Sequence, residues 1–248
     1  MSVGILPRIK PDALPRFLTA SGAVIAISAT GYDLGEPWLG AFRVRTEREY
    51  PGTSPDLQER RFQVAPLGNS GPIIDRVLKG RVTDEVSVHG GRFIVARSSV
   101  DEGVLMAWQG RWHEVFDFVN DSSITLAQAW RRFDRLTFHD SPLGVRVEVG
   151  KIPAERIYDE QVHKPVPGVG YLAILPPVDA AGLVPKWRGA TVRSGEVWRK
   201  EAVEGGRPIL VHASLQAVTL LYPEGSARDE TPRLTFLDQV QSITWSAG

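Results

Sequence analysis

The sequence predicts a β-rich α+β protein, in which an antiparallel sheet packs on one main helix and a smaller β-sandwich or barrel-like unit follows. Two observations favour this fold. Short apolar runs are separated by turn residues at a spacing of about ten residues, which is typical of antiparallel strands. Sustained helical periodicity occurs mainly in residues 120–136, and parallel strands would need more helical crossovers than that.

Residues 1–22 are expected to form an N-terminal arm. Proline and glycine interrupt this stretch, and Asp12 is placed to cap a single helical turn that holds Leu14, Phe17 and Leu18 before Gly22 ends it. Terminal segments of this kind either fray or pack across a neighbouring surface.

Strands and turns follow. The opening strands are expected at residues 23–29, 39–46 and 60–66, with a polar loop at 47–59. Residues 72–80 have helical spacing, and the side chain of Asn69 or Ser70 is the expected N-cap. The clearest β-meander covers residues 82–88, 92–98, 104–109 and 112–118.

The best helix lies within residues 120–136, where five apolar residues fall on one face and Asp121, Ser122 and Ser123 are cap candidates. A strand at 143–150 completes a first domain of residues 1–150. This domain combines the N-terminal arm, the β-meander and the helix.

Residues 151–170 are rich in proline and weakly periodic, and we interpret them as a linker. A small all-β domain is then expected over residues 171–248. The two parts show no convincing sequence repeat. The expected strands are 171–175, two strands within 190–203 around Ser194-Gly195, 208–213, 215–222, 233–236 and 242–245.

Composition excludes several classes of function. The chain has no cysteine, so disulfides, thiolate metal sites and a cysteine nucleophile are excluded. Its 29 basic and 29 acidic residues balance, whereas direct binding of nucleic acid usually needs a basic excess. We find no signal peptide and no transmembrane segment, and therefore expect no membrane partner and a location in the cytoplasm or a virion.

One short motif resembles a catalytic site. Gly68-Asn69-Ser70-Gly71-Pro72 lacks one glycine of the nucleophile turn of trypsin-like serine proteases. The chain order also differs, because Ser70 precedes the first histidine, His89. The motif also does not form the G-x-S-x-G turn of other hydrolases. We therefore interpret Ser70 as the start of a helix.

The five histidines have no metal-binding spacing, since no two are separated by two or four residues. The polar clusters with the best claim to function are His139-Asp140-Ser141, and then His113-Glu114. Neither has the pattern of a known site. The sequence therefore predicts no catalytic, metal-binding or cofactor-binding residue, and no cofactor.

Seven tryptophans are many for 248 residues. Most are expected in cores, although tryptophan is also over-represented at protein interfaces. The predicted interface residues are Phe17, Leu18, Trp38, Trp187 and Trp198.

These observations lead to one functional prediction with two alternatives. The chain is expected to be a non-enzymatic structural or adaptor subunit of a larger assembly, such as a phage tail or capsid component, with other protein subunits or copies of itself as partners. The first alternative is a small-partner binding protein, such as an immunity protein or secretion accessory factor. The second is a hydrolase with a dispersed site.

Overall fold

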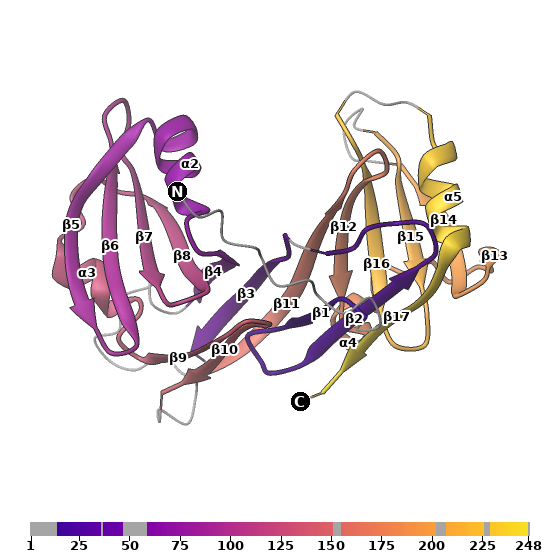
Figure 1. The fold of residues 1–248 in the computed structure, drawn as a ribbon, viewed down its shortest axis with the longest axis horizontal. Coiled ribbons are helices and arrows are strands. Elements are labelled where there is room, and N and C mark those ends of the chain that lie inside the picture. Colours follow the sequence, from indigo (N-terminus) through magenta and orange to yellow (C-terminus); the bar gives the residue numbers. More distant parts are fainter. Residues whose placement is uncertain are drawn as a thin grey trace, which may run out of the picture.

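The computed structural model describes residues 14–35, 37–46, 59–150, 155–201, 207–225 and 229–247. The chain forms two lobes that are bridged by long central strands (Figure 1). It is β-rich with large antiparallel sheets, as the sequence predicts. The first 13 residues of the expected arm lie outside the described residues. At its end, the expected helical turn is replaced by a short strand, β1 (Arg16–Leu18).

The larger sheet has twelve strands and runs through both lobes, with β3 and β11 at its centre. All its neighbouring strands are antiparallel. From edge to edge, the strands are β13 (Ala190–Val192), β14 (Gly195–Lys200), β15 (Ile209–Ala213), β16 (Val218–Pro223), β12 (Gly170–Leu175), β11 (Glu155–Val166), β3 (Leu39–Thr46), β4 (Glu59–Pro66), β8 (His113–Asn120), β7 (Gly103–Gln109), β6 (Gly91–Ser98) and β5 (Gly80–Val88).

The smaller sheet has five strands from both ends and the middle of the chain. Its order is β17 (Val240–Ser246), β2 (Val24–Ala29), β1, β10 (Gly144–Val149) and β9 (Leu136–Ser141). Its strands pair antiparallel except at one point, where Leu18 of β1 lies beside Gly144 of β10 in a parallel contact.

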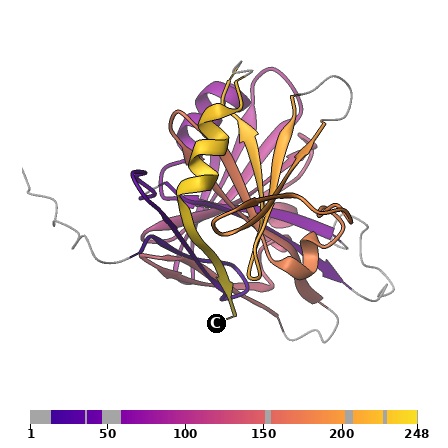
Figure 2. The same ribbon diagram turned by 90° about the vertical axis from the view of Figure 1, so that its right-hand side faces the viewer.

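The helices of the described residues are short. The first is α2 (Ser70–Pro72), which continues as a π-helical segment, η1 (Ile73–Leu78). The others are α3 (Leu126–Arg131), α4 (Pro177–Ala180) and α5 (Thr231–Gln239). Figure 2 shows α5 leading directly into β17 at the end of the chain.

The chain contains the same topology twice. The first copy runs from β2 to β9 and the second from β10 to β17, each as three strands, a helical segment, four strands, a helix and a final strand. The third to seventh strands of each copy extend the larger sheet outward in the same order. The copies join reciprocally, because β3 pairs with β11, β9 with β10, and β17 with β2. The sequence showed no repeat, so only the structure reveals this duplication.

Apolar side chains form three clusters. The main one draws on both sheets and fills the space between them. On the opposite face of the first lobe, Ile74 and Leu78 of η1 pack with Leu105. The corresponding face of the second lobe is covered by α4, where Ala180 packs with Trp198. Each lobe therefore uses the helical segment after its third strand to cover its outer face.

Several elements differ from the sequence prediction. Residues 155–166 of the expected linker form β11, the longest strand among the described residues, although the division into two domains stays a prediction. Residues 233–236, expected as a strand, lie in α5, where Pro232 occupies the first turn and Arg233, Phe236 and Leu237 are buried at helical spacing. The expected main helix spans only Leu126–Arg131, and Thr125 with Gln128 caps it in place of residues 121–123.

Candidate functional site

The two polar clusters singled out by sequence meet at the turn between β7 and β8. Asp140 of β9 accepts hydrogen bonds from the backbone N–H groups of Arg111 and Trp112, both at 2.7 Å. Its other oxygen lies 2.9 Å from Nδ1 of His113, and both side chains are buried. Asp140 thus satisfies the donors of a tight turn, which is a structural role for a carboxylate.

A second buried cluster surrounds Ser70. The Ser70 hydroxyl donates to Oε2 of Glu114 at 2.8 Å, and the Ser70 backbone N–H also donates to that carboxylate. Gln109 adds a hydrogen bond from Nε2 to Oε2 of Glu114 at 2.9 Å. The predicted cap is therefore wrong in its acceptor: Glu114, and not the side chain of Asn69 or Ser70, accepts from the N–H at the start of the helix.

These two clusters lie on opposite faces of β8. His113 and Glu114 are neighbours in a strand, and successive side chains point to opposite faces. Ser70 contacts Glu114 on one face of β8, and Asp140 contacts His113 on the other face. A relay of serine, histidine and aspartate therefore does not form here, because the imidazole that Asp140 orients is turned away from the hydroxyl.

A third contact was not predicted. Ser194, in the turn between β13 and β14, lies with its Oγ 3.1 Å from Nε2 of His212 on β15. Burial lowers the pKa of His212 to about 4, so its ring is neutral at physiological pH. Nδ1 of His212 and Oγ1 of Thr219, its cross-strand partner, are both buried without a hydrogen bond among the described residues. Within the described ranges, the ring thus has no carboxylate to orient it as a general base.

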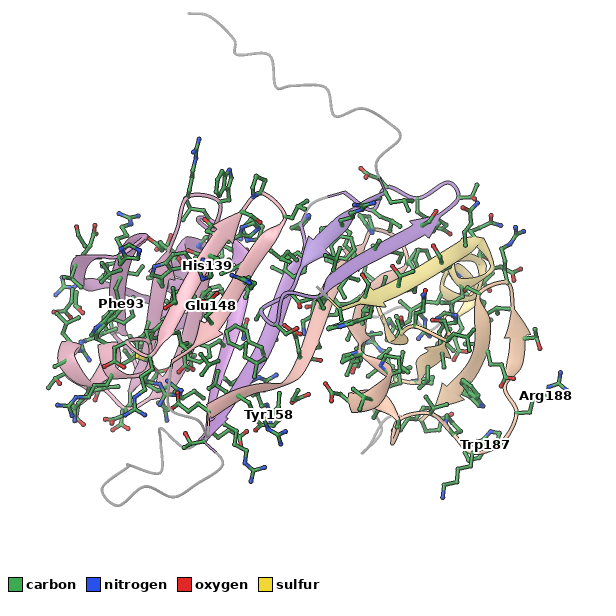
Figure 3. All side chains as sticks on the ribbon, turned by 90° about the horizontal axis from the view of Figure 1, so that it is seen from below. Phe93, His139, Glu148, Tyr158, Trp187 and Arg188 are labelled. Atoms are coloured by element: carbon green, nitrogen blue, oxygen red, sulfur yellow. The ribbon has the colours of Figure 1, made fainter. Side chains whose placement is uncertain are left out.

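The remaining histidines are dispersed. His163 stacks on Tyr171 with ring centroids 5.3 Å apart, and burial lowers its pKa to about 4. His139 lies on the surface near Glu148, with 3.2 Å between Nε2 and Oε1 (Figure 3). No three histidine, aspartate or glutamate side chains are gathered as metal ligands in the described part of the chain.

Among the predicted interface residues, most are used within the chain. Phe17 and Trp38 are buried and stack with centroids 6.1 Å apart, and Leu18 is half-buried. Trp198 is buried and donates its indole N–H to the carbonyl of Trp187 at 2.8 Å.

Trp187 differs from the other four. Its side chain is 69% exposed and projects from the end of the second lobe beside Arg188 (Figure 3). The backbone around it is held by the Trp198 hydrogen bond and by a second bond from Gly189 N–H to Glu196 Oε2 at 2.9 Å. The geometry therefore presents one large aromatic ring to solvent from a fixed backbone.

Comparisons with known proteins assign no relative. No protein-family model, curated protein or solved structure matches the chain. Among the residues that the structure describes, no helix has the length and apolarity needed to cross a bilayer. Any function must therefore be argued from the contacts of this chain.

Proposed function

We propose that the chain is a non-enzymatic structural or adaptor subunit of a larger protein assembly, such as a phage tail or capsid component in a virion or the cytoplasm. The observation that carries the proposal is the exposed indole of Trp187, whose backbone is held by hydrogen bonds at its own carbonyl and at the N–H of Gly189. A large aromatic side chain that loses little conformational freedom on binding is typical of the centre of a protein interface.

The polar contacts support a role without catalysis. Ser70, Glu114, His113 and Asp140 are buried, and each takes part in holding a turn or the start of a helix. Chemistry needs side chains that remain available to a substrate, whereas these groups are occupied by the fold.

The surroundings of Trp187 indicate the partner. Lys186 and Arg188 are its neighbours in the chain and are exposed, as is Arg193 in the next turn. A protein subunit with an apolar recess bordered by carboxylates would complement them. Copies of this chain are suitable partners because its net charge of zero gives little repulsion between molecules. Within such a subunit, we expect the first sheet to rest on its helix and the second lobe to act as a small sandwich or barrel-like unit.

Size-exclusion chromatography with light scattering, over a wide range of concentration, tests this proposal. We expect a discrete oligomer or a concentration-dependent one, and we expect Trp187→Ala to shift it toward the monomer. Trp112→Ala is the control, since Trp112 is another exposed tryptophan, at 37%, and follows an arginine, Arg111, that lies over its ring. A wild-type protein that stays monomeric at every concentration, or equal effects of both variants, would contradict self-assembly through Trp187.

The hydrolase alternative has one observation in its favour, the Ser194–His212 contact at 3.1 Å. A fluorophosphonate probe tests it directly. Stoichiometric labelling that Ser194→Ala abolishes would support a nucleophilic serine and overturn the proposal of a protein without catalysis. We expect no labelling, because a ring with its pKa lowered to about 4 is a weak base for a serine hydroxyl.

A further inference from the structure

The outer end of the first lobe carries an unusual pair of like charges. Arg81 of β5 and Arg97 of β6 are direct cross-strand partners in an antiparallel pair. Direct partners project from the same face with their Cβ atoms about 4.5–5.5 Å apart, and like charges at these positions destabilise the pairing. A group of opposite charge beside the pair would compensate for this repulsion.

The protein supplies only part of that compensation. Arg97 donates to the carbonyl oxygens of Ser122 at 3.0 Å and Ile124 at 2.7 Å, and Oδ2 of Asp84 lies 3.9 Å from its Nη2. These contacts fix the guanidinium of Arg97 in place. No carboxylate is within ion-pairing distance of Arg81 in the described part of the chain.

A third cation lies beside this pair. Lys79 ends η1 in a left-handed conformation with φ at 50°, and its N–H donates to the carbonyl of Ile74. Its own carbonyl accepts from the N–H and the hydroxyl of Ser99. Lys79 also contributes to lowering the pKa of Asp101, after hydrogen bonds from Ser98 and Gly103. Asp84 therefore interacts with Arg97 and Asp101 with Lys79, while neither forms an ion pair with Arg81 among the residues that the structure describes.

The backbones of β5 and β6 approach closely between these residues. A Cβ at Gly80 would lie 2.1 Å from the carbonyl oxygen of Arg97, so only glycine allows β5 to start this close to β6. A hollow of about 440 Å³ lies here, lined by Lys79, Gly80, Arg81, Thr83, Arg97, Ser98 and Ser99. Its charged lining residues are all cationic, and the hollow is large enough for a tetrahedral oxyanion.

We propose that this hollow binds a phosphate group, either as the free anion or as the terminal group of a phosphomonoester. Arg81 supplies a planar pair of N–H donors, and Lys79 supplies a compact positive charge. Arg97, held in place by its own hydrogen bonds, adds to the positive potential. The bound dianion relieves the repulsion between Arg81 and Arg97. This site lies in the other lobe from Trp187 and does not depend on the function proposed above.

Titration of the full-length protein with inorganic phosphate tests the site. Backbone and arginine side-chain NMR signals are followed, with sodium chloride at matched ionic strength as the reference. We expect saturable shifts at Gly80 and at the side chains of Arg81 and Arg97. A parallel titration with glycerol phosphate distinguishes the free anion from a phosphomonoester as the ligand. A site that accepts phosphomonoesters gives the same shifts with glycerol phosphate, whereas a site for the free anion alone does not. If neither phosphate nor glycerol phosphate gives larger shifts than sodium chloride, the proposal is overturned.

Two matched variants make the test specific. Arg81→Gln removes one cation of the hollow, and we expect it to weaken phosphate binding by about tenfold or more, as for the loss of a charge-assisted hydrogen bond. Arg92→Gln is the control, because Arg92 is an exposed arginine of β6 that pairs with Glu85 outside the hollow. If both variants bind phosphate equally more weakly than wild type, the effect comes from general surface charge, and the proposed site is contradicted.

A second readout does not depend on binding. In phosphate-free buffer of low ionic strength, Arg81→Gln should be at least as stable as wild type, because it removes a like-charge cross-strand pair. Phosphate should then raise the melting temperature of wild type more than that of the variant. A variant that is less stable than wild type without phosphate would show that Arg81 has a structural role, and would overturn the argument from repulsion.

Discussion

Arg60 and Glu155 form a buried ion pair that joins the two copies of the topology, with 3.2 Å between Nη2 and Oε1. Arg60 lies on β4 of the first copy and Glu155 begins β11 of the second, on either side of the central strand β3. Both side chains are only 1% exposed. Arg135 also contacts Oε1 of Glu155 at 3.2 Å, and Arg60 donates to the carbonyl of Arg132.

Breaking this pair should destabilise the protein strongly. Glu155→Leu leaves the Arg60 guanidinium buried without its carboxylate, which is expected to lower the free energy of unfolding by about 3–5 kcal/mol. The double variant Arg60→Met/Glu155→Leu should recover most of that loss, because two apolar side chains carry no charge to desolvate. Urea unfolding of the three proteins measures both changes. A double variant as unstable as the single one would show that the ion pair itself is essential.

The buried histidines should make stability depend on pH. The pKa of His212 is lowered from 6.5 to about 4 by burial, so the unfolded chain binds more protons than the folded one between these values. The stability that His212 contributes is present above pH 6.5 and is lost as pH falls through about 4, by up to about 3 kcal/mol. Glu160 acts in the opposite direction, because desolvation raises its pKa.

A variant isolates the contribution of His212 from that of the carboxyls. Urea unfolding from pH 7 to pH 4 should show a shallower loss of stability in His212→Leu than in wild type. Ser194→Ala should keep the wild-type slope, since it removes the hydrogen bond to Nε2 and leaves the titrating ring. Parallel slopes in wild type and His212→Leu would contradict the assignment.

Asp140 should contribute to stability without contributing to chemistry. Asp140→Ala leaves the N–H groups of Arg111 and Trp112 and the ring of His113 without their acceptor. The expected loss is about 1–3 kcal/mol, because the buried ring of His113 loses its partner, whereas the N–H groups of the exposed residues Arg111 and Trp112 can bind water instead. Asp238→Ala, at an exposed position of α5, is the control and should change stability little. If thermal or urea unfolding shows the same loss of stability in both variants, Asp140 does not hold the turn.

The fixed backbone at Trp187 should depend on Gly189. A Cβ at this position would lie 2.7 Å from Cε2 of Trp198 and 2.7 Å from the carbonyl oxygen of Val197. Gly189→Ala is therefore expected to cost about 1–3 kcal/mol, as overpacking does. Gly182→Ala is the matched control, because nothing lies within 4 Å of its Cβ position. Tryptophan fluorescence and urea unfolding should both change for Gly189→Ala alone.

The strands with clear local signals were predicted well from the sequence. The meander of β5 to β8 follows apolar runs with turn residues between them, and the strand predicted at residues 39–46 is confirmed as β3 with the same bounds. Residues 233–236 were predicted wrongly as a strand because a four-residue run fits both periods, and the structure places them in α5. The apolar pattern also predicted a longer helix than α3, because turn hydrogen bonds such as that from Phe133 N–H to the Trp130 carbonyl replace the helix after Arg131.

Long-range pairing was decided by the tertiary structure alone. Local sequence indicates that a segment is a strand, but it does not indicate that β11 pairs with β3, or that β9 and β17 exchange places between the two copies. The polar contacts follow the same rule, because Asp140 meets His113 and Arg60 meets Glu155 only once strands far apart in the chain are adjacent. The sequence by itself determined β-rich character, the turns and the absence of cysteine chemistry, since these depend on neighbouring residues and composition. The duplicated topology and the Lys79–Arg81–Arg97 hollow required the folded chain, because they depend on which strands lie side by side.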